Sequence, residues 1–454
     1  MKAIPSKEAP RNDGEHPRIE PAVTSIEDLS SIFTKMILRD EDHGRQHSIE
    51  GLAYASLQPK IKESIVKNQP LLKKLLTTLS EAPPRSPTTY GALSIFVNLT
   101  QYQPAMTEEQ KKMTQLKAYA NAAGKLKGPD PLNSDESVSE RCKIVFQAGI
   151  TPVLVTHSRN GSPASLSLIA SIIHAISFTR TLRGPLAQQG AVKLLVPIWA
   201  ILPEADQVAR RTTAHALARI LISTNPSLVF GGNRSNPLDA AIRPLASIIP
   251  PDPAADSRDL LPTFETLMAL TNLASLDDES TRPTIIHIAW SHIEEQLLSA
   301  NALVTKAAVE LICNLVQAPE GIALYADGTP KAKNRLHILL ALADAEDEGT
   351  RSAAGGALAS LAGFDQVVRD IVGRERGVNM VLGLCVDDNE DLRHRGVVTV
   401  QNMVAAEGET GKLAREKLKE QKGVDVLKEC LKKSRRPEVL QVTVQALKPL
   451  LEDK

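Results

Sequence analysis

The chain contains the sequence Ala-Leu-Thr-Asn-Leu-Ala at residues 269–274 and the sequence Leu-Ile-Cys-Asn-Leu at residues 311–315. Their asparagines, Asn272 and Asn314, are 42 residues apart. Both segments combine small and aliphatic residues at helical spacing with one polar residue near the end. A helical segment that returns after a fixed interval predicts a repeat architecture.

Related segments occur along most of the chain. One marker residue from each gives the series Asn98, Phe178, Arg219, Asn272, Asn314, Ser360 and Asn402. The successive spacings are 80, 41, 53, 42, 46 and 42 residues. We take the first spacing to span two periods and the third to contain a loop that begins at Pro250. The remaining values fit the period of armadillo and HEAT repeats, which is about 40–47 residues.

A second marker, a glycine followed by an apolar helix start, repeats with the same period. It occurs at Gly149 and Gly190, which are 41 residues apart, and at Gly377 and Gly423, which are 46 apart. Glycine lets the chain turn between a short helix and the next one without a clash of Cβ. Together the markers predict an all-α fold: a right-handed superhelical solenoid of armadillo repeats, roughly ten in number.

The repeats account for nearly all of the 454 residues. Residues 1–26 are rich in proline and charge and are predicted to be a disordered N-terminal tail. Residues 27–454 are predicted to form one armadillo-repeat domain. Two stretches rich in proline and polar residues, near 125–137 and 250–262, are expected to be flexible loops within it.

Composition excludes several function classes. Lys plus Arg and Asp plus Glu both total 53, so no charge excess favours nucleic-acid binding. No apolar stretch approaches the roughly 18 residues of a transmembrane helix, and no signal peptide is visible, so we expect a cytoplasmic protein without a membrane partner. The four scattered cysteines fit a reducing compartment.

Catalytic motifs are absent from the sequence, and we expect neither enzyme activity nor a metal or cofactor. The segment Gly411-Lys412 resembles the end of a phosphate-binding loop, but Leu413 replaces the required Ser or Thr. No G-x-S-x-G or H-E-x-x-H pattern occurs.

The asparagines are the main candidates for a binding site. Asn98, Asn272, Asn314 and Asn402 each lie near the end of the third helix of a repeat, and such helices line one concave groove in an armadillo array. An amide that donates and accepts at once is suited to hold the backbone of an extended peptide. The alternative is that each asparagine satisfies its own helix end.

Four further residues complete the predicted groove. His215 and Arg219 are four residues apart and share a helix face, and Arg219 replaces the asparagine of its repeat, where it is placed to meet a client carboxylate or carbonyl. Met268 and Glu310 lie one turn before Asn272 and Asn314. Nuclear-import adaptors of similar architecture carry a tryptophan one turn before the asparagine. Neither Trp199 nor Trp290 occupies that position here, which argues against an import adaptor.

Several short segments occur in the order found in the UCS-domain family, the myosin-directed co-chaperones, which the chain resembles from about Ile49 to its C-terminus. They are Gly51-Leu52-Ala53-Tyr54, His215-Ala216-Leu217-Ala218-Arg219, Asn225-Pro226, Arg243-Pro244-Leu245, Thr271-Asn272-Leu273, Cys313-Asn314-Leu315 and His394-Arg395-Gly396.

This resemblance implies a curved armadillo array that holds the myosin motor domain in its groove and assists its folding. Animal members of the family add an N-terminal tetratricopeptide domain that binds the acidic tail of the ninety-kilodalton heat-shock chaperone. Only a short polar segment precedes Ile26 here, as in fungal-type members. We therefore expect no tail binding, while an indirect or non-tail contact with that chaperone stays open. The alternative function is an armadillo-type trafficking or import adaptor for extended peptides.

Overall fold

The computed structural model describes residues 25–39, 44–104, 109–110, 112–113, 130–230, 238–253, 259–276 and 278–452. Within these ranges every regular element is a helix, which confirms the all-α prediction. Nine helices contact one another in succession along the whole array, and we call them the ladder helices. They are α2 (Arg45–Ala55), α5 (Pro87–Thr100), α9 (Pro163–Ser177), α12 (Gln207–Ile222), α15 (Leu261–Ala274), α17 (Ala302–Leu315), α20 (Glu348–Leu361), α23 (Glu390–Ala405) and α26 (Pro437–Glu452).

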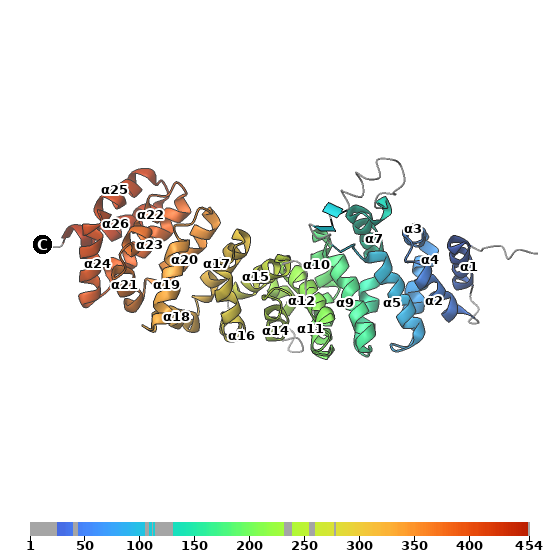
Figure 1. Ribbon diagram of the computed structural model, residues 1–454. Coiled ribbons are helices and arrows are strands. Elements are labelled where there is room, and N and C mark those ends of the chain that lie inside the picture. Colours follow the sequence, from blue (N-terminus) through green and yellow to red (C-terminus); the bar gives the residue numbers. More distant parts are fainter. Residues whose placement is uncertain are drawn as a thin grey trace, which may run out of the picture.

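The other helices of the described residues connect the ladder helices, and most of them pack against these helices or against one another. They are α1 (Ile26–Leu38), α3 (Pro59–Lys67), α4 (Gln69–Glu81), the 3₁₀ helix η1 (Pro131–Asn133), α7 (Asp135–Gln147), α8 (Ile150–Ser158), α10 (Arg180–Gln188), α11 (Ala191–Ile201), α13 (Pro226–Phe230), α14 (Asp239–Ala246), α16 (Thr281–Gln296), α18 (Pro319–Ala326), α19 (Pro330–Leu342), α21 (Asp365–Val372), α22 (Gly377–Cys385), α24 (Gly408–Glu420) and α25 (Gly423–Lys433). Figure 1 shows the elongated array that results, with α1 at one end and α24 to α26 at the other.

A typical repeat consists of two shorter helices followed by a ladder helix, as in α10, α11 and α12. Aliphatic and alanine side chains fill the space between successive repeats, and one continuous buried cluster runs from Ile37 to Leu450. Small residues such as Ala216 and Ala218 let neighbouring ladder helices approach closely. This architecture is the armadillo-like solenoid that the sequence period predicts.

The first marker spacing does not span two periods, as we expected from the sequence. Helices α5 and α9 contact each other directly as consecutive ladder helices. The 80 residues between Asn98 and Phe178 therefore belong to one repeat that carries an insertion between α5 and α7, and they do not hide a second repeat. The described residues contain nine ladder helices.

Helix starts follow local sequence rules. The Ser86 and Ser162 side chains accept hydrogen bonds from the backbone N–H groups of Thr89 and Ser165, and a proline occupies the first helical position after each serine. Such a cap satisfies an N–H that has no partner within the helix, and proline at that position has no N–H to lose.

The repeated glycines are needed for two different reasons. Gly149 and Gly190 both have φ of 92°, a left-handed conformation that glycine adopts without strain. Gly377 and Gly423 do not have positive φ; an added Cβ would instead lie 2.2 Å from the Ile371 carbonyl oxygen and 2.8 Å from that of Leu418. The marker thus reflects turn geometry in two repeats and close backbone approach in the other two.

The predicted tail and loops fall mainly outside the described residues. Of the tail 1–26, only Ser25 and Ile26 are described, and they form the capped start of α1. The predicted loop 125–137 is too long at its C-terminal end, because Ser134 caps α7, which begins at Asp135. The predicted loop 250–262 ends earlier than expected, because α15 begins at Leu261.

Across the described part of the chain, no one helix combines the length and apolar character needed to span a membrane.

Candidate functional site

The four predicted asparagines form hydrogen bonds between repeats. In each case Nδ2 donates to a backbone carbonyl near the C-terminal end of the preceding ladder helix. Asn98 donates to Ala53 at 3.0 Å, Asn272 to Leu221 at 2.7 Å and Thr224 at 2.8 Å, Asn314 to Thr271 at 3.1 Å, and Asn402 to Ala359 at 2.9 Å. The asparagines therefore satisfy the end of a neighbouring helix, which neither sequence interpretation had specified.

These hydrogen bonds limit what the amides offer to a ligand. Both donor hydrogens of Asn272 are directed at the two carbonyl groups that it bonds. Among the residues that the structure describes, no hydrogen bond reaches the Oδ1 atoms of the four asparagines, and their side chains are half-buried. A backbone clamp that donates and accepts at once, as predicted for Asn272, would require the hydrogen bonds between repeats to break.

Arg219 is predicted to reach a client carboxylate or carbonyl, but the carboxylate that it bonds in the structure belongs to the chain itself. Arg219 is only 3% exposed, and its Nε donates to Oε2 of Glu265 at 2.9 Å. His215 is also buried, with Nε2 2.6 Å from the same Oε2. Arg183 of α10 donates from Nη2 to Oε1 at 3.2 Å. The predicted binding residues thus form a buried charge cluster that joins α10, α12 and α15.

The cluster extends to a third ladder helix through His174 of α9. A carboxylate only accepts, so Nε2 of His215 carries its proton toward Glu265. Nδ1 of His215 lies 3.2 Å from Nε2 of His174, which in turn lies 3.3 Å from Nη1 of Arg219. A guanidinium only donates, so Nε2 of His174 accepts from Arg219 and links α9 to the cluster.

The charge states of the cluster follow from burial and neighbouring groups. Burial, followed by the influence of His215 and Arg219, lowers the pKa of His174 well below its usual value. Burial also lowers the pKa of His215, against the hydrogen bond to Glu265. For Glu265 burial alone would raise the pKa, but the hydrogen bond from His215 and the charge of Arg219 outweigh it and lower the pKa to about 2. The ionised Glu265 is shared by two guanidinium groups.

The two predicted groove residues one turn before the asparagines are half-buried. Met268 packs against the hydrophobic core. Burial raises the pKa of Glu310, and Asp347 adds to that effect while Lys306 opposes it. Neither Trp199 of α11 nor Trp290 of α16 lies on a ladder helix, which agrees with the sequence argument against an import adaptor.

Sequence reasoning missed His174, Arg183 and Glu265, although a signal was present for two of them. Glu265 is the only charged residue of α15, and His174 is the only ionisable residue of α9. An isolated ionisable residue in an otherwise apolar helix is rarely buried without a partner. That rule would have directed attention to partners one repeat away.

Aromatic side chains remain exposed along the first three ladder helices. Tyr54 of α2 is 71% exposed, Tyr90 of α5 is 51% exposed, and Phe178, directly after α9, is 45% exposed. Phe178 stacks on Tyr102 with ring centroids 4.6 Å apart. Together with Val97, His174 and other residues, these two rings line a pocket of about 340 Å³. This end of the ladder layer therefore presents aromatic surface to solvent.

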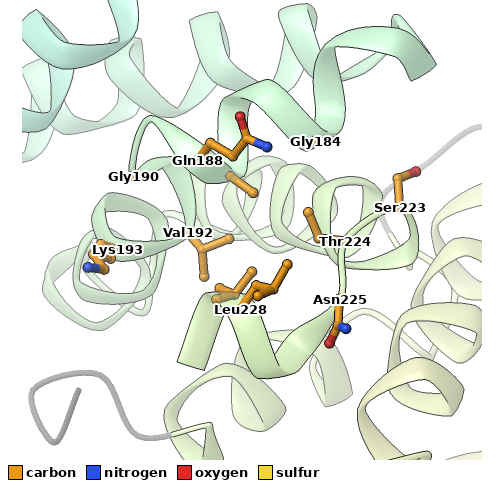
Figure 2. Close-up of a pocket in the computed structure, with 11 residues that line it drawn as sticks. Gly184, Gln188, Gly190, Val192, Lys193, Ser223, Thr224, Asn225 and Leu228 are labelled. Atoms are coloured by element: carbon orange, nitrogen blue, oxygen red, sulfur yellow. The ribbon is translucent and has the colours of Figure 1, made fainter. Parts of the chain in front are cut away.

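A larger pocket lies between α10, the start of α11 and α13, and its volume is about 610 Å³. Figure 2 shows Val192 and Leu228 facing each other across it, with Gln188 above them and Asn225 at the side. We call it the α10–α13 pocket. It is lined by Gly184, Ala187, Gln188, Gly190, Val192, Lys193, Ser223, Thr224, Asn225, Leu228 and Val229.

No protein-family model matches the chain. Ring assembly protein 3 of Schizosaccharomyces pombe is 29% identical over 360 residues, which cover 78% of this chain and 47% of the relative. The solved structure of UNC-45 from Drosophila melanogaster is 28% identical with a TM-score of 0.78, covering 94% of this chain and 52% of that one. The myosin chaperone UNC-45 from C. elegans, solved in complex with a Hsp70 peptide, shares the fold at 22% identity and a TM-score of 0.75, covering 94% of this chain and 44% of that one.

The fold and these likenesses define the class: the chain is an armadillo-like helical repeat protein. The relatives confirm the resemblance found in the sequence, and the chain is a homologue of the UCS-domain proteins. It spans about half the length of the relatives that it matches.

Proposed function

We propose that this chain is a myosin-directed co-chaperone of the cytoplasm that binds the myosin motor domain and has no enzyme activity of its own. The observation that carries the proposal is the match to UNC-45 from Drosophila melanogaster, with a TM-score of 0.78 over 94% of this chain. Such coverage takes in most of the helical array, so most of the surface available to a client belongs to the shared part of the fold.

The exposed aromatic side chains of the first three ladder helices support a binding role. Tyr54 and Tyr90 stand on consecutive ladder helices, and Phe178 follows the next one. Tyrosine and phenylalanine supply large contact area at a small cost in side-chain entropy, and aromatic residues are enriched at protein interfaces. A partly folded motor domain exposes apolar surface that such residues would cover.

The aromatic surface replaces the asparagines as the proposed contact region. The amide groups of the asparagines already bond adjacent repeats, whereas Tyr54 and Tyr90 are free to contact a client. Covering apolar segments of an unfolded motor domain lowers the concentration of species that aggregate. This mechanism needs no nucleotide, since binding alone protects the client.

The proposal is tested by heating a purified myosin motor domain with the chain and following light scattering. We expect the chain to suppress scattering and the double variant Tyr54→Ser/Tyr90→Ser to do so at least about fivefold less effectively, because aromatic contacts dominate many interfaces. The matched control is Leu298→Ser, which removes an equally exposed apolar side chain (74%) at the end of α16, outside the ladder helices.

Two results would contradict the proposal. If the chain neither binds the motor domain nor reduces its aggregation, the co-chaperone function is wrong. If a basic import-signal peptide binds while the motor domain does not, the adaptor alternative replaces it.

A further inference from the structure

The α10–α13 pocket combines the exposed apolar side chain of Leu228 with the charge of Lys193, for which the described residues offer no ion-pair partner, and the proposed function does not use it. We propose that it is a docking site for an extended protein segment that carries an apolar side chain next to a carboxylate. The site differs from the aromatic surface of α2, α5 and α9, and the inference does not depend on myosin as the client.

The apolar part of the pocket would be covered by a bound side chain. Leu228 is 84% exposed, although it lies in a helix, and it faces Val192 across the pocket (Figure 2). Ala187 and Val229 complete the apolar lining. A volume of about 610 Å³ admits a leucine or phenylalanine side chain together with adjoining backbone.

The charge of the lining selects an acidic neighbour for that side chain. Lys193 is the only ionisable residue among the eleven described residues that line the pocket, and none of these eleven is a carboxylate that could neutralise it. Its side chain is exposed, and no ion pair joins it to another of the residues that the structure describes. Arg180, at the start of α10 and one turn before Gly184, is also exposed. A segment with Asp or Glu beside its apolar residue complements these cations.

The polar edge of the pocket indicates an extended segment rather than a small molecule. Two pockets share the turn formed by Ser223, Thr224 and Asn225. One is the α10–α13 pocket, and the other has a volume of about 520 Å³ and also includes Asn272. Nδ2 of Asn272 donates to the Thr224 carbonyl at 2.8 Å, which fixes this turn in place. A peptide backbone can therefore continue from one pocket into the other along groups that already have a defined position.

Gly184 provides a way to fill the pocket with a side chain. It lies within α10, and beyond its chain neighbours a Cβ added there would meet nothing within 4 Å. The variant Gly184→Leu should place its side chain in the space that a ligand would use. Because this residue precedes Pro185, where a Cβ is less well accommodated in a helix, charge exchange at Lys193 provides a second test that leaves the helix unchanged. Gly383 of α22 is a matched control, because it is also helical and its Cβ would also meet nothing within 4 Å, far from the pocket.

The probe is a phage-displayed library of random peptides, selected on the immobilised full chain. We expect the selected peptides to contain an aliphatic or aromatic residue within two positions of Asp or Glu. Measured by fluorescence anisotropy, they should bind the original chain and Gly383→Leu equally, but Gly184→Leu at least about tenfold more weakly, the usual scale for loss of a central contact. Lys193→Glu should weaken them as well, and replacing the peptide carboxylate by lysine should restore binding to that variant.

Three outcomes would overturn the proposal. The first is that selection yields no binding peptide. The second is that the selected peptides bind Gly184→Leu as tightly as the original chain. The third is a concentration-dependent dimer in analytical ultracentrifugation that Gly184→Leu abolishes, because the occupant would then be a second copy of the chain. None of these results bears on motor-domain protection, so this inference and the proposed function fail separately.

Discussion

Nε of Arg219 donates a hydrogen bond to Oε2 of Glu265 across 2.9 Å, and both side chains are buried between two consecutive ladder helices. A second guanidinium, that of Arg183, donates to the other carboxylate oxygen from α10. Glu265 therefore neutralises cations from two helices at the middle of the array. Removing one member of a buried ionic group leaves its partners without a counter-charge, which costs far more than the loss of a surface pair.

We predict that Glu265→Gln lowers the free energy of unfolding by about 3–5 kcal/mol, because the glutamine keeps the shape of the side chain but leaves two buried cations uncompensated. Urea denaturation followed by circular dichroism measures the change. The control is Glu140→Gln, whose exposed carboxylate pairs with Lys143 at 3.2 Å on α7 and should change stability by less than about 1 kcal/mol. Equal losses for the two variants would contradict the structural importance of the cluster.

The same cluster predicts lower stability in mild acid. The pKa values of His174 and His215 are lowered by folding, so the unfolded chain takes up protons first as the pH falls below their usual value of 6.5. Stability should then decrease by up to about 1.4 kcal/mol per pH unit for each imidazole. The pKa of Glu265 is lowered to about 2, so its contribution is complete above its usual value of 4.5 and is lost only between 4.5 and 2. The histidines therefore determine the slope just below pH 6.5.

The pH effect is measured as the urea midpoint between neutral pH and about pH 5, within the range in which an ordinary histidine titrates. His174→Gln should reduce the slope, because one of the two imidazoles with lowered pKa is gone. His47→Gln should leave the slope unchanged, since the His47 side chain is exposed. A pH-independent midpoint in the original chain would show that His174 and His215 do not control stability in this range.

The period of the repeats could be predicted from sequence because it follows from local patterns of apolar residues at helical spacing. Segments around Asn272, Asn314 and Asn402 recur at nearly constant spacing, and the structure places all three on ladder helices. The insertion before α7 could not be recognised in the same way. A spacing of 80 residues fits two periods as well as one period with an insertion, and only the contact between α5 and α9 distinguishes these alternatives.

The chemistry of the candidate site was less predictable, because the partners of its side chains come from other repeats. Arg219 and Glu265 are 46 residues apart in sequence. Helical spacing showed that His215 and Arg219 share a face, but it could not show that this face meets Glu265 of the next ladder helix. The same limit applies to Asn98, whose acceptor, the Ala53 carbonyl, is 45 residues earlier.

The hydrogen bonds of the asparagines predict graded losses of stability. Asn272→Ala removes two bonds to backbone carbonyls, whereas Asn314→Ala removes one. At about 0.5–1.5 kcal/mol for each neutral hydrogen bond, the first variant should lose roughly twice as much free energy of unfolding as the second. Thermal melting of both variants checks this order. Unchanged melting combined with weaker motor-domain binding would instead restore the idea that these amides clamp a client backbone.

Gly396 belongs to the segment His394-Arg395-Gly396, which resembles the UCS-domain family. An added Cβ would lie 2.8 Å from the backbone nitrogen of Cys385 and 2.9 Å from the carbonyl carbon of Leu384, because α23 packs directly against the end of α22. Backbone atoms of a helix cannot move aside as a flexible side chain can. We therefore expect Gly396→Ala to separate the two helices and to cost about 1–3 kcal/mol of stability.

Gly383→Ala on the same α22 helix is the control, and its effect should have the opposite sign. The new methyl group meets nothing within 4 Å, and alanine in a helix interior is more stable than glycine by about 0.5–1 kcal/mol. Urea denaturation of the two variants in parallel measures the change in the free energy of unfolding for each, and we expect a decrease for Gly396→Ala and an increase for Gly383→Ala. If Gly396→Ala also stabilised the chain, the close approach of α22 and α23 would not be what requires glycine in this segment.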